Sequence, residues 1–251
     1  MVSTSQDLSS AIDKLMVTAK GAQPADVFVA QAWEMAGAHA FILNALLDVY
    51  EQAPTIPKHL SVDFVGYALQ WVAVLHHHHS WEEEHYYPMF THKYDTSFIV
   101  AEHETFTAAV HEMEEYLISC LPSGEKHGYG RIAPQHAQQE FSATHLQAVI
   151  DKAAGPLSSH LLQEVTYLHS DKLHEAGFTV EEIRHIAAET NKYMMNMPTT
   201  TFLVYVVLLS PKGSEFPPAP PFIKNYVVPW VLYWPNRRWW KFGLKNFYRS
   251  Q

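Results

Sequence analysis

The chain has 251 residues, is 47% hydrophobic and carries a formal net charge of −9, so it can bury a substantial core and lacks the basic face that nucleic-acid binding requires. A single cysteine, Cys120, excludes a disulfide framework within the chain. The one compositional anomaly is the 17 histidines, which point to a metal site or to pH sensing.

The hydropathy of the sequence predicts neither a secretory signal nor a membrane-spanning segment. Residues 1–23 are polar and serine-rich, with one possible short helix over residues 8–18, and they lack the charged-then-apolar order of a secretory signal. The longest apolar run, residues 202–209, is too short to span a bilayer. We therefore expect a cytoplasmic protein with no membrane and no nucleic-acid partner.

Apolar residues recur at helical spacing in four stretches, which predict an all-α, up-down four-helix bundle. The second stretch ends at Tyr87, because the following proline disfavours helical dihedral angles at the residue before it. The expected helices cover residues 24–50, then a stretch capped by Asp63 and ending at Tyr87, then 98–120, and finally 135–173 with an interruption at Gly155-Pro156.

The last part of the chain differs in character from the bundle. Thr179 and Glu182 have the spacing of a capping box and predict an additional helix that ends near Met195. Residues 197–251 hold a β-prone run, a proline-rich turn and an aromatic tail, which predict an irregular extension packed on the bundle. The expected division is an N-terminal segment 1–23, a bundle 24–196 and an extension 197–251.

The most distinctive stretch is VLHHHHSWEEEHYYP, residues 74–88, in which four histidines run into three glutamates. A histidine and a glutamate four residues apart lie on the same face of a helix, within reach of one metal ion. Two pairs fit this spacing, His78 with Glu82 and His79 with Glu83. Both are in phase with apolar stripes, so periodicity leaves the register open.

Other histidines lie in step with the apolar stripes of the remaining helices. His39, His103 and His160 point inward on the first, third and fourth, and Glu164 follows His160 by four residues; His111 shares a polar face and is expected to point to water. One inward histidine on each helix and two His-x-x-x-Glu pairs suit two metal ions in a bundle core. Imidazole and carboxylate together favour iron.

Four segments resemble the hemerythrin-like (HHE cation-binding) family, in particular its fungal members with an extra C-terminal segment. They are AHAFILNAL at His39, HHSWEEEHYYP at His78, EHETFTAAV at His103 and SHLLQEVTYL at His160. The resemblance covers about residues 30–168 and implies a hemerythrin-like bundle with two iron ions in a non-haem di-iron centre. It selects the pair His78/Glu82, so the implied metal ligands are His39, His78, Glu82, His103, His160 and Glu164. It leaves His76, His77, His79 and His85 in outer contacts or at the surface.

The chain departs from the oxygen-carrying members of that family at two places. Those members have a second histidine four residues after the one on the third helix, where this chain has Thr107. They also end with a histidine and an aspartate five residues later, whereas this chain has the pair His160 and Glu164. The missing histidine implies an additional open position on one iron. We therefore expect the site to bind dioxygen or nitric oxide and to activate dioxygen, oxidising a small organic substrate. The alternatives are a module that binds, senses or detoxifies dioxygen, nitric oxide or iron, and a metal-stabilised structural protein.

Overall fold

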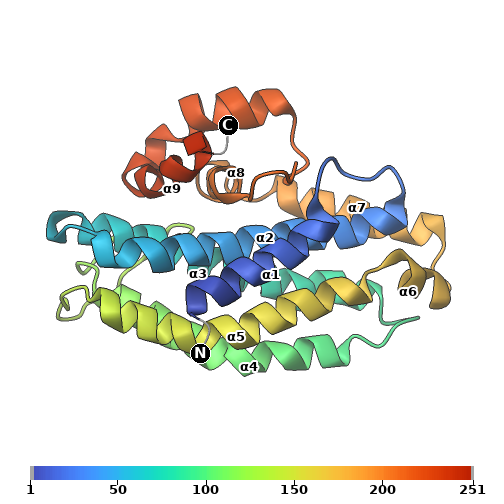
Figure 1. The fold of residues 1–251 in the computed structure, drawn as a ribbon, viewed down its shortest axis with the longest axis horizontal. Helices are drawn as coiled ribbons and strands as arrows, with labels where there is room; N and C mark the ends of the chain where they lie inside the picture. The colour runs from blue at the N-terminus through green and yellow to red at the C-terminus, as the bar shows by residue number, and fades with distance from the viewer. Residues whose placement is uncertain (1–2, 250–251) are drawn as a thin grey trace.

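The structure, a computed structural model, describes residues 3–249. Its centre is an up-down bundle of four long helices, α2 (Val27–Gln52), α3 (Ser61–Trp81), α4 (Ser97–Ser119) and α5 (Ala143–Tyr167) (Figure 1). Each of the four contacts the next along the chain, and α5 returns to contact α2. The four helices therefore enclose one continuous core, and the expected all-α bundle is confirmed.

Local capping explains where two of these helices begin. The Asp26 carboxylate accepts a hydrogen bond from the Phe28 amide at 2.8 Å, so α2 starts after the predicted residue 24. The Ser142 hydroxyl accepts from the His145 amide at 3.3 Å, which leaves residues 135–142 outside α5, contrary to the prediction. Asp63 does not cap α3, because that helix already begins at Ser61.

The predicted interruption at Gly155-Pro156 is also wrong, since α5 runs through Pro156 without a break. A proline inside a helix costs about 3 kcal/mol, because it removes one backbone hydrogen bond and crowds the preceding turn. Buried side chains on both sides of it, including Ile150 and Leu157, pack into the core and offset this cost.

Shorter elements surround the bundle. The first helix, α1 (Thr4–Ala19), packs against α2 and α5. The α7 helix (Val180–Met195) starts with the predicted capping box between Thr179 and Glu182 and contacts α2. The others are η1 (Ala53–Thr55), η2 (Lys58–Leu60), η3 (Glu82–Tyr86), η4 (Tyr87–Met89), β1 (Lys126–His127), β2 (Arg131–Ile132) and α6 (Ser170–Glu175).

The C-terminal part is helical rather than irregular, and its β-prone run forms no strand. It comprises η5 (Thr199–Leu203), α8 (Val204–Leu209), η6 (Ile223–Leu232), η7 (Trp234–Asn236) and α9 (Arg237–Arg249). Every residue of α8 is buried, so tertiary packing outweighs β propensity there, and a helix satisfies its own backbone hydrogen bonds without a partner strand. These elements lie over α2 and α3, on the side away from α4 and α5 (Figure 1).

The extension makes close contact with the bundle helices. A Cβ added to Gly66 of α3 would lie 2.2 Å from the Trp239 indole nitrogen, so this glycine makes room for the tryptophan. The Asn44 amide donates to the Leu209 carbonyl at 2.7 Å, and the rings of Tyr67 and Tyr205 pack edge to face. Within the part of the chain described, none of the helices combines the length and apolarity that crossing a bilayer needs.

Candidate metal centre

Four side chains from three bundle helices meet in the first of two clusters. His39 comes from α2, His78 and Glu82 from α3 and its continuation, and Glu164 from α5. One potential ligand atom of each lies within 4.8 Å of those of the others. The Nε2 atoms of His39 and His78 are 3.0 Å apart, and that of His39 is 3.2 Å from a Glu164 oxygen.

The second cluster consists of three histidines, His79 of α3, His103 of α4 and His160 of α5, whose facing nitrogens also lie within 4.8 Å of one another. The His79 and His103 rings stack with centroids 4.2 Å apart, and the His103 and His160 rings meet edge to face at 4.6 Å. Three imidazoles from three helices thus converge without a carboxylate of their own.

The two glutamates connect the clusters. Glu82 places Oε1 at 3.0 Å from the Nε2 of His78 and Oε2 at 3.7 Å from the Nε2 of His103. Glu164 places Oε2 at 3.2 Å from the Nε2 of His39 and at 3.4 Å from that of His160. Both carboxylates are fully buried. Each therefore faces both histidine clusters, as a carboxylate shared by two cations would.

The structure brings together all six residues named from the sequence, and it adds His79, which the sequence analysis placed outside the centre. Adjacent helical residues point about 100° apart. Because both apolar stripes of α3 are buried, His78 can face α2 while His79 faces α4. Glu82 remains beside His78, and its amide bonds the carbonyls of both His78 and His79 where α3 passes into η3.

Thr107 does not face the two clusters: it is exposed on α4, and its hydroxyl donates to the His103 carbonyl at 2.6 Å. The neighbouring Phe106 is buried and packs against the rings of His79 and His160. The third imidazole near His103 and His160 comes from His79 of α3 rather than from a second position on α4.

The other histidines of the run lie outside the centre, as expected. The Nε2 of His76 is 3.1 Å from Glu114, which also pairs with Arg131. His77 is exposed and its Nδ1 lies 3.3 Å from the Tyr193 hydroxyl. His85 and His111 are exposed as well.

Outer contacts fix the orientation of three of the inward histidines. The Nδ1 of His39 donates to the Leu161 carbonyl at 2.7 Å. Likewise, the Nδ1 of His103 lies 2.6 Å from Glu83 and that of His160 lies 3.0 Å from Glu102. A proton held at Nδ1 leaves the lone pair at Nε2, which faces the centre. Glu83, which the sequence offered as a ligand in the alternative register, instead orients a histidine.

This arrangement predicts a role for Glu102 at a distance from the metal. Replacing it by alanine should lower metal affinity about 10- to 100-fold, since His160 loses the acceptor that fixes its tautomer. The control is Glu104→Ala on the exposed face of the same helix. Titration of the metal-free variants with ferrous iron measures both affinities, and equal values would contradict the role.

Burial favours the neutral form of four histidines of the clusters, and neutral imidazole is the form that binds metal. It lowers the pKa of His78 and of His79 well below the usual value, and the neighbouring histidines lower them further. Burial also lowers the pKa of His103, and it lowers that of His160 to about 3. For Glu82, burial and the facing Glu164 raise the pKa well above the usual range.

The centre fits a pair of cations because its buried polar atoms lack other partners. Six buried atoms have no hydrogen-bond partner: the Nε2 atoms of His79, His103 and His160, both carboxylate oxygens of Glu82, and the Oε2 of Glu164. Leaving such atoms unpaired in a core costs several kcal/mol in total. Cations between the clusters would satisfy them, and five imidazoles with two carboxylates form a donor set that suits iron.

Sequence reasoning also missed a phenol beside the centre. Tyr87 is fully buried, and its hydroxyl donates to the Oε1 of Glu164, the oxygen that turns away from the histidines. The residue was assigned only the end of a helix. Its position follows from η3, which carries the chain from Glu82 across the end of the centre to Tyr87.

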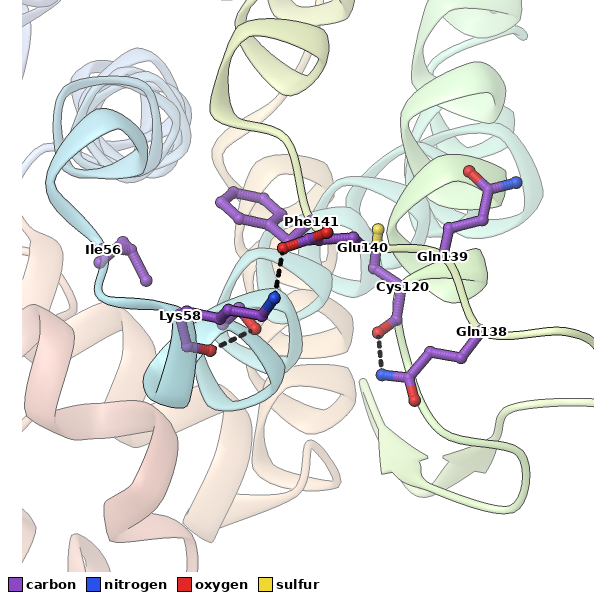
Figure 2. Close-up of a pocket in the computed structure, with 8 residues that line it drawn as sticks. Ile56, Lys58, Cys120, Gln138, Gln139, Glu140 and Phe141 are labelled. Carbon is purple, nitrogen blue, oxygen red and sulfur yellow. Dashed lines mark hydrogen bonds and ion pairs between the residues drawn. The ribbon is translucent and has the colours of Figure 1, made fainter.

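The two surface pockets described do not border these residues. One, of about 410 Å³, is lined by Lys58, Cys120, Phe141 and neighbouring side chains, with Lys58 paired to Glu140 at 2.8 Å (Figure 2). The other is formed by residues 91–97. Neither contains a side chain of the two clusters.

A family model describing the hemerythrin HHE cation-binding domain matches residues 32–164, more than half of the chain. The chain belongs to this family. The match begins inside α2 and ends at Glu164, so it includes every residue of the two clusters. No curated protein and no solved structure matches the chain. The hemerythrin domain agrees with cation binding at the His/Glu clusters.

Proposed function

We propose that this hemerythrin-domain protein is a non-haem di-iron protein that binds dioxygen in the bundle core. One iron would be held by His39 and His78, and the other by His79, His103 and His160, with Glu82 and Glu164 shared between them. The observation that carries the proposal is the convergence of seven donors, five of them buried and His78 and His79 partly buried, whose facing atoms lie within 4.8 Å in each cluster. Two ferrous ions would supply the electrons that dioxygen accepts on binding.

The residues around the centre favour binding of a small diatomic ligand over entry of an organic one. With His79 included, three imidazoles occupy one side, and Phe106 covers them with a buried ring. The same reasoning applies to nitric oxide, which needs no larger space than dioxygen.

Oxidation of a small organic substrate is the second candidate, and Tyr87 is the observation that favours it. Its buried hydroxyl donates to Glu164, so a proton donor lies next to a carboxylate of the centre. Irreversible reduction of dioxygen consumes protons, and a proton donor beside the centre makes this reduction easier. The variant Tyr87→Phe lacks the hydroxyl and should therefore favour reversible binding of dioxygen.

The experiment is to load the protein with ferrous iron without oxygen and to cycle it between dioxygen and argon. If dioxygen binds reversibly, the visible spectrum appears and disappears over repeated cycles, and nitric oxide competes with it. Oxidation in one step without recovery would contradict reversible binding. Adding candidate substrates then tests the second candidate, which requires product formation that depends on iron and oxygen.

A further inference from the structure

The outermost helix of the C-terminal part exposes a row of aromatic side chains. Phe222, Tyr226, Trp230 and Trp234 recur every four residues along η6 and its flanks, and each is more than half exposed, from 53% to 64%. We call these four residues the aromatic ridge. Among the exposed large hydrophobic side chains described between residues 3 and 243, every aromatic one belongs to this ridge.

The ridge faces away from the bundle. The opposite side of η6 holds the buried Val228 and Pro229, and η6 contacts α8, which in turn contacts α2. In Figure 1 this helix forms the upper edge of the molecule, above α8 and α9. Four aromatic rings so placed expose more apolar surface than the fold needs to close its own core.

Basic residues outnumber acidic ones in the segment that carries the ridge. The chain has 26 acidic residues, and none of them lies after Glu215, whereas six of its 17 lysines and arginines do: Lys224, Arg237, Arg238, Lys241, Lys245 and Arg249. Lys224 donates to the carbonyls of Glu215 and Pro217, and the Arg237 guanidinium lies 5.7 Å from the centre of the Trp234 ring. Arg238 pairs with Glu125, in the loop after α4, and Lys241 pairs with Asp63 of α3. Lys224 is partly buried and also interacts with the Glu215 carboxylate, so Arg237 is the exposed cation at the end of the ridge.

We propose that the aromatic ridge docks the protein onto an anionic lipid surface. Tryptophan and tyrosine rings prefer the level of the lipid headgroups, because one end of the ring is apolar and the other forms hydrogen bonds. The exposed Arg237 beside them is attracted to anionic headgroups. A helix with this composition lies in the interface without spanning it. The expectation of no membrane partner rested only on the absence of a spanning segment.

Charge decides between this occupant and a second copy of the chain. A symmetric contact would bring Lys224 and Arg237 of one copy against the same cations of the other, which is unfavourable. An anionic surface instead provides opposite charge over the whole ridge. The proposal does not depend on the metal centre, which lies in the bundle core, on the other side of α8.

The test is sedimentation of the iron-loaded protein with vesicles of phosphatidylcholine alone or mixed with phosphatidylserine. We expect binding to the mixed vesicles that weakens as salt is raised. A second readout is quenching of tryptophan fluorescence by brominated lipid. Of the seven tryptophans only Trp230 and Trp234 are exposed, so partial quenching is expected, limited to these two.

The variant Phe222→Ser/Tyr226→Ser keeps both reporter tryptophans and should lower vesicle binding at least about tenfold. The matched control is Val17→Ser/Met195→Ser, which removes exposed apolar side chains elsewhere and should bind like the unaltered protein. Circular dichroism and the melting temperature check that both variants are folded. Absence of binding to either vesicle, equal binding by the ridge variant, or self-association that buries Trp230 without lipid would each overturn the proposal.

Discussion

Replacing His79 by alanine is expected to reduce iron content from about two ions per chain to about one, because the position formed by three imidazoles would keep only two of them. His103 and His160 would remain, but neither belongs to the cluster that holds His39 and His78. The measurement is elemental analysis after anaerobic loading with iron. Added imidazole should restore the second ion, since it can occupy the space that the side chain leaves.

The matched control is His77→Ala, which removes the preceding histidine of the same helix. Its side chain is exposed and lies beside the Tyr193 hydroxyl rather than in the centre, so full iron content is expected. Full iron content in His79→Ala as well would mean that His79 is not a metal ligand, as the sequence analysis expected. Equal loss in both variants would mean that the end of α3 has a different helical phase.

Removing the metal is expected to lower the melting temperature by about 10 °C. Ions present at a thousandfold excess over their dissociation constant stabilise the folded state by about 4 kcal/mol. For a domain of this size, each kcal/mol corresponds to about 2–4 °C. The physical cause is that the metal-free core leaves Glu82 and Glu164 buried and facing each other. Calorimetry with and without a chelator measures the shift.

Glu82→Gln should separate the two roles of this carboxylate. Burial raises the pKa of Glu82 in the folded protein above its usual value of 4.5. Protonated Glu82 therefore stabilises the metal-free fold fully below pH 4.5, and this stabilisation is lost as the pH rises from 4.5 to the folded-state pKa. Since glutamine does not ionise, the metal-free variant should lose less stability than the unaltered protein as the pH is raised above about 4.5. It should also gain less from added iron.

Glu84→Gln is the control for this comparison, since it removes a charge from the same run of glutamates at an exposed position. It should follow the unaltered protein at every pH and keep the full response to iron. A metal-free Glu82→Gln protein with the same pH dependence as the unaltered one would contradict the buried, mutually facing carboxylates.

Helical periodicity located the bundle and its inward histidines because α4 and α5 each bury one clear stripe, and because His39 lies in the apolar stripe of α2, although most of α2 is buried. His39, His103 and His160 could be assigned in this way. The α3 helix buries two stripes, so its pattern holds no information on which of two adjacent histidines points inward, and the structure places both there. The family resemblance selected His78 alone, so His79 was not predicted to face the centre.

Other differences arise where tertiary contacts decide local structure. The β-branched run of α8 is helical because it is buried on all sides, which no local propensity expresses. Thr107 was expected to lie beside a metal because it follows His103 by four residues. The spacing alone does not show that position 107 lies at the edge of the apolar stripe of α4, where the side chain is exposed. The hydrogen bond from Tyr87 to Glu164 joins segments distant in the chain, and nothing near either residue in the sequence predicts it.

The most direct test of the centre is anomalous X-ray diffraction at the iron edge from crystals of the iron-loaded protein. Two iron peaks are expected in the bundle core, one beside His39 and His78 and the other among His79, His103 and His160, with Glu82 and Glu164 between them. A single peak, or a second one that lies away from His79, would contradict a di-iron centre at these residues.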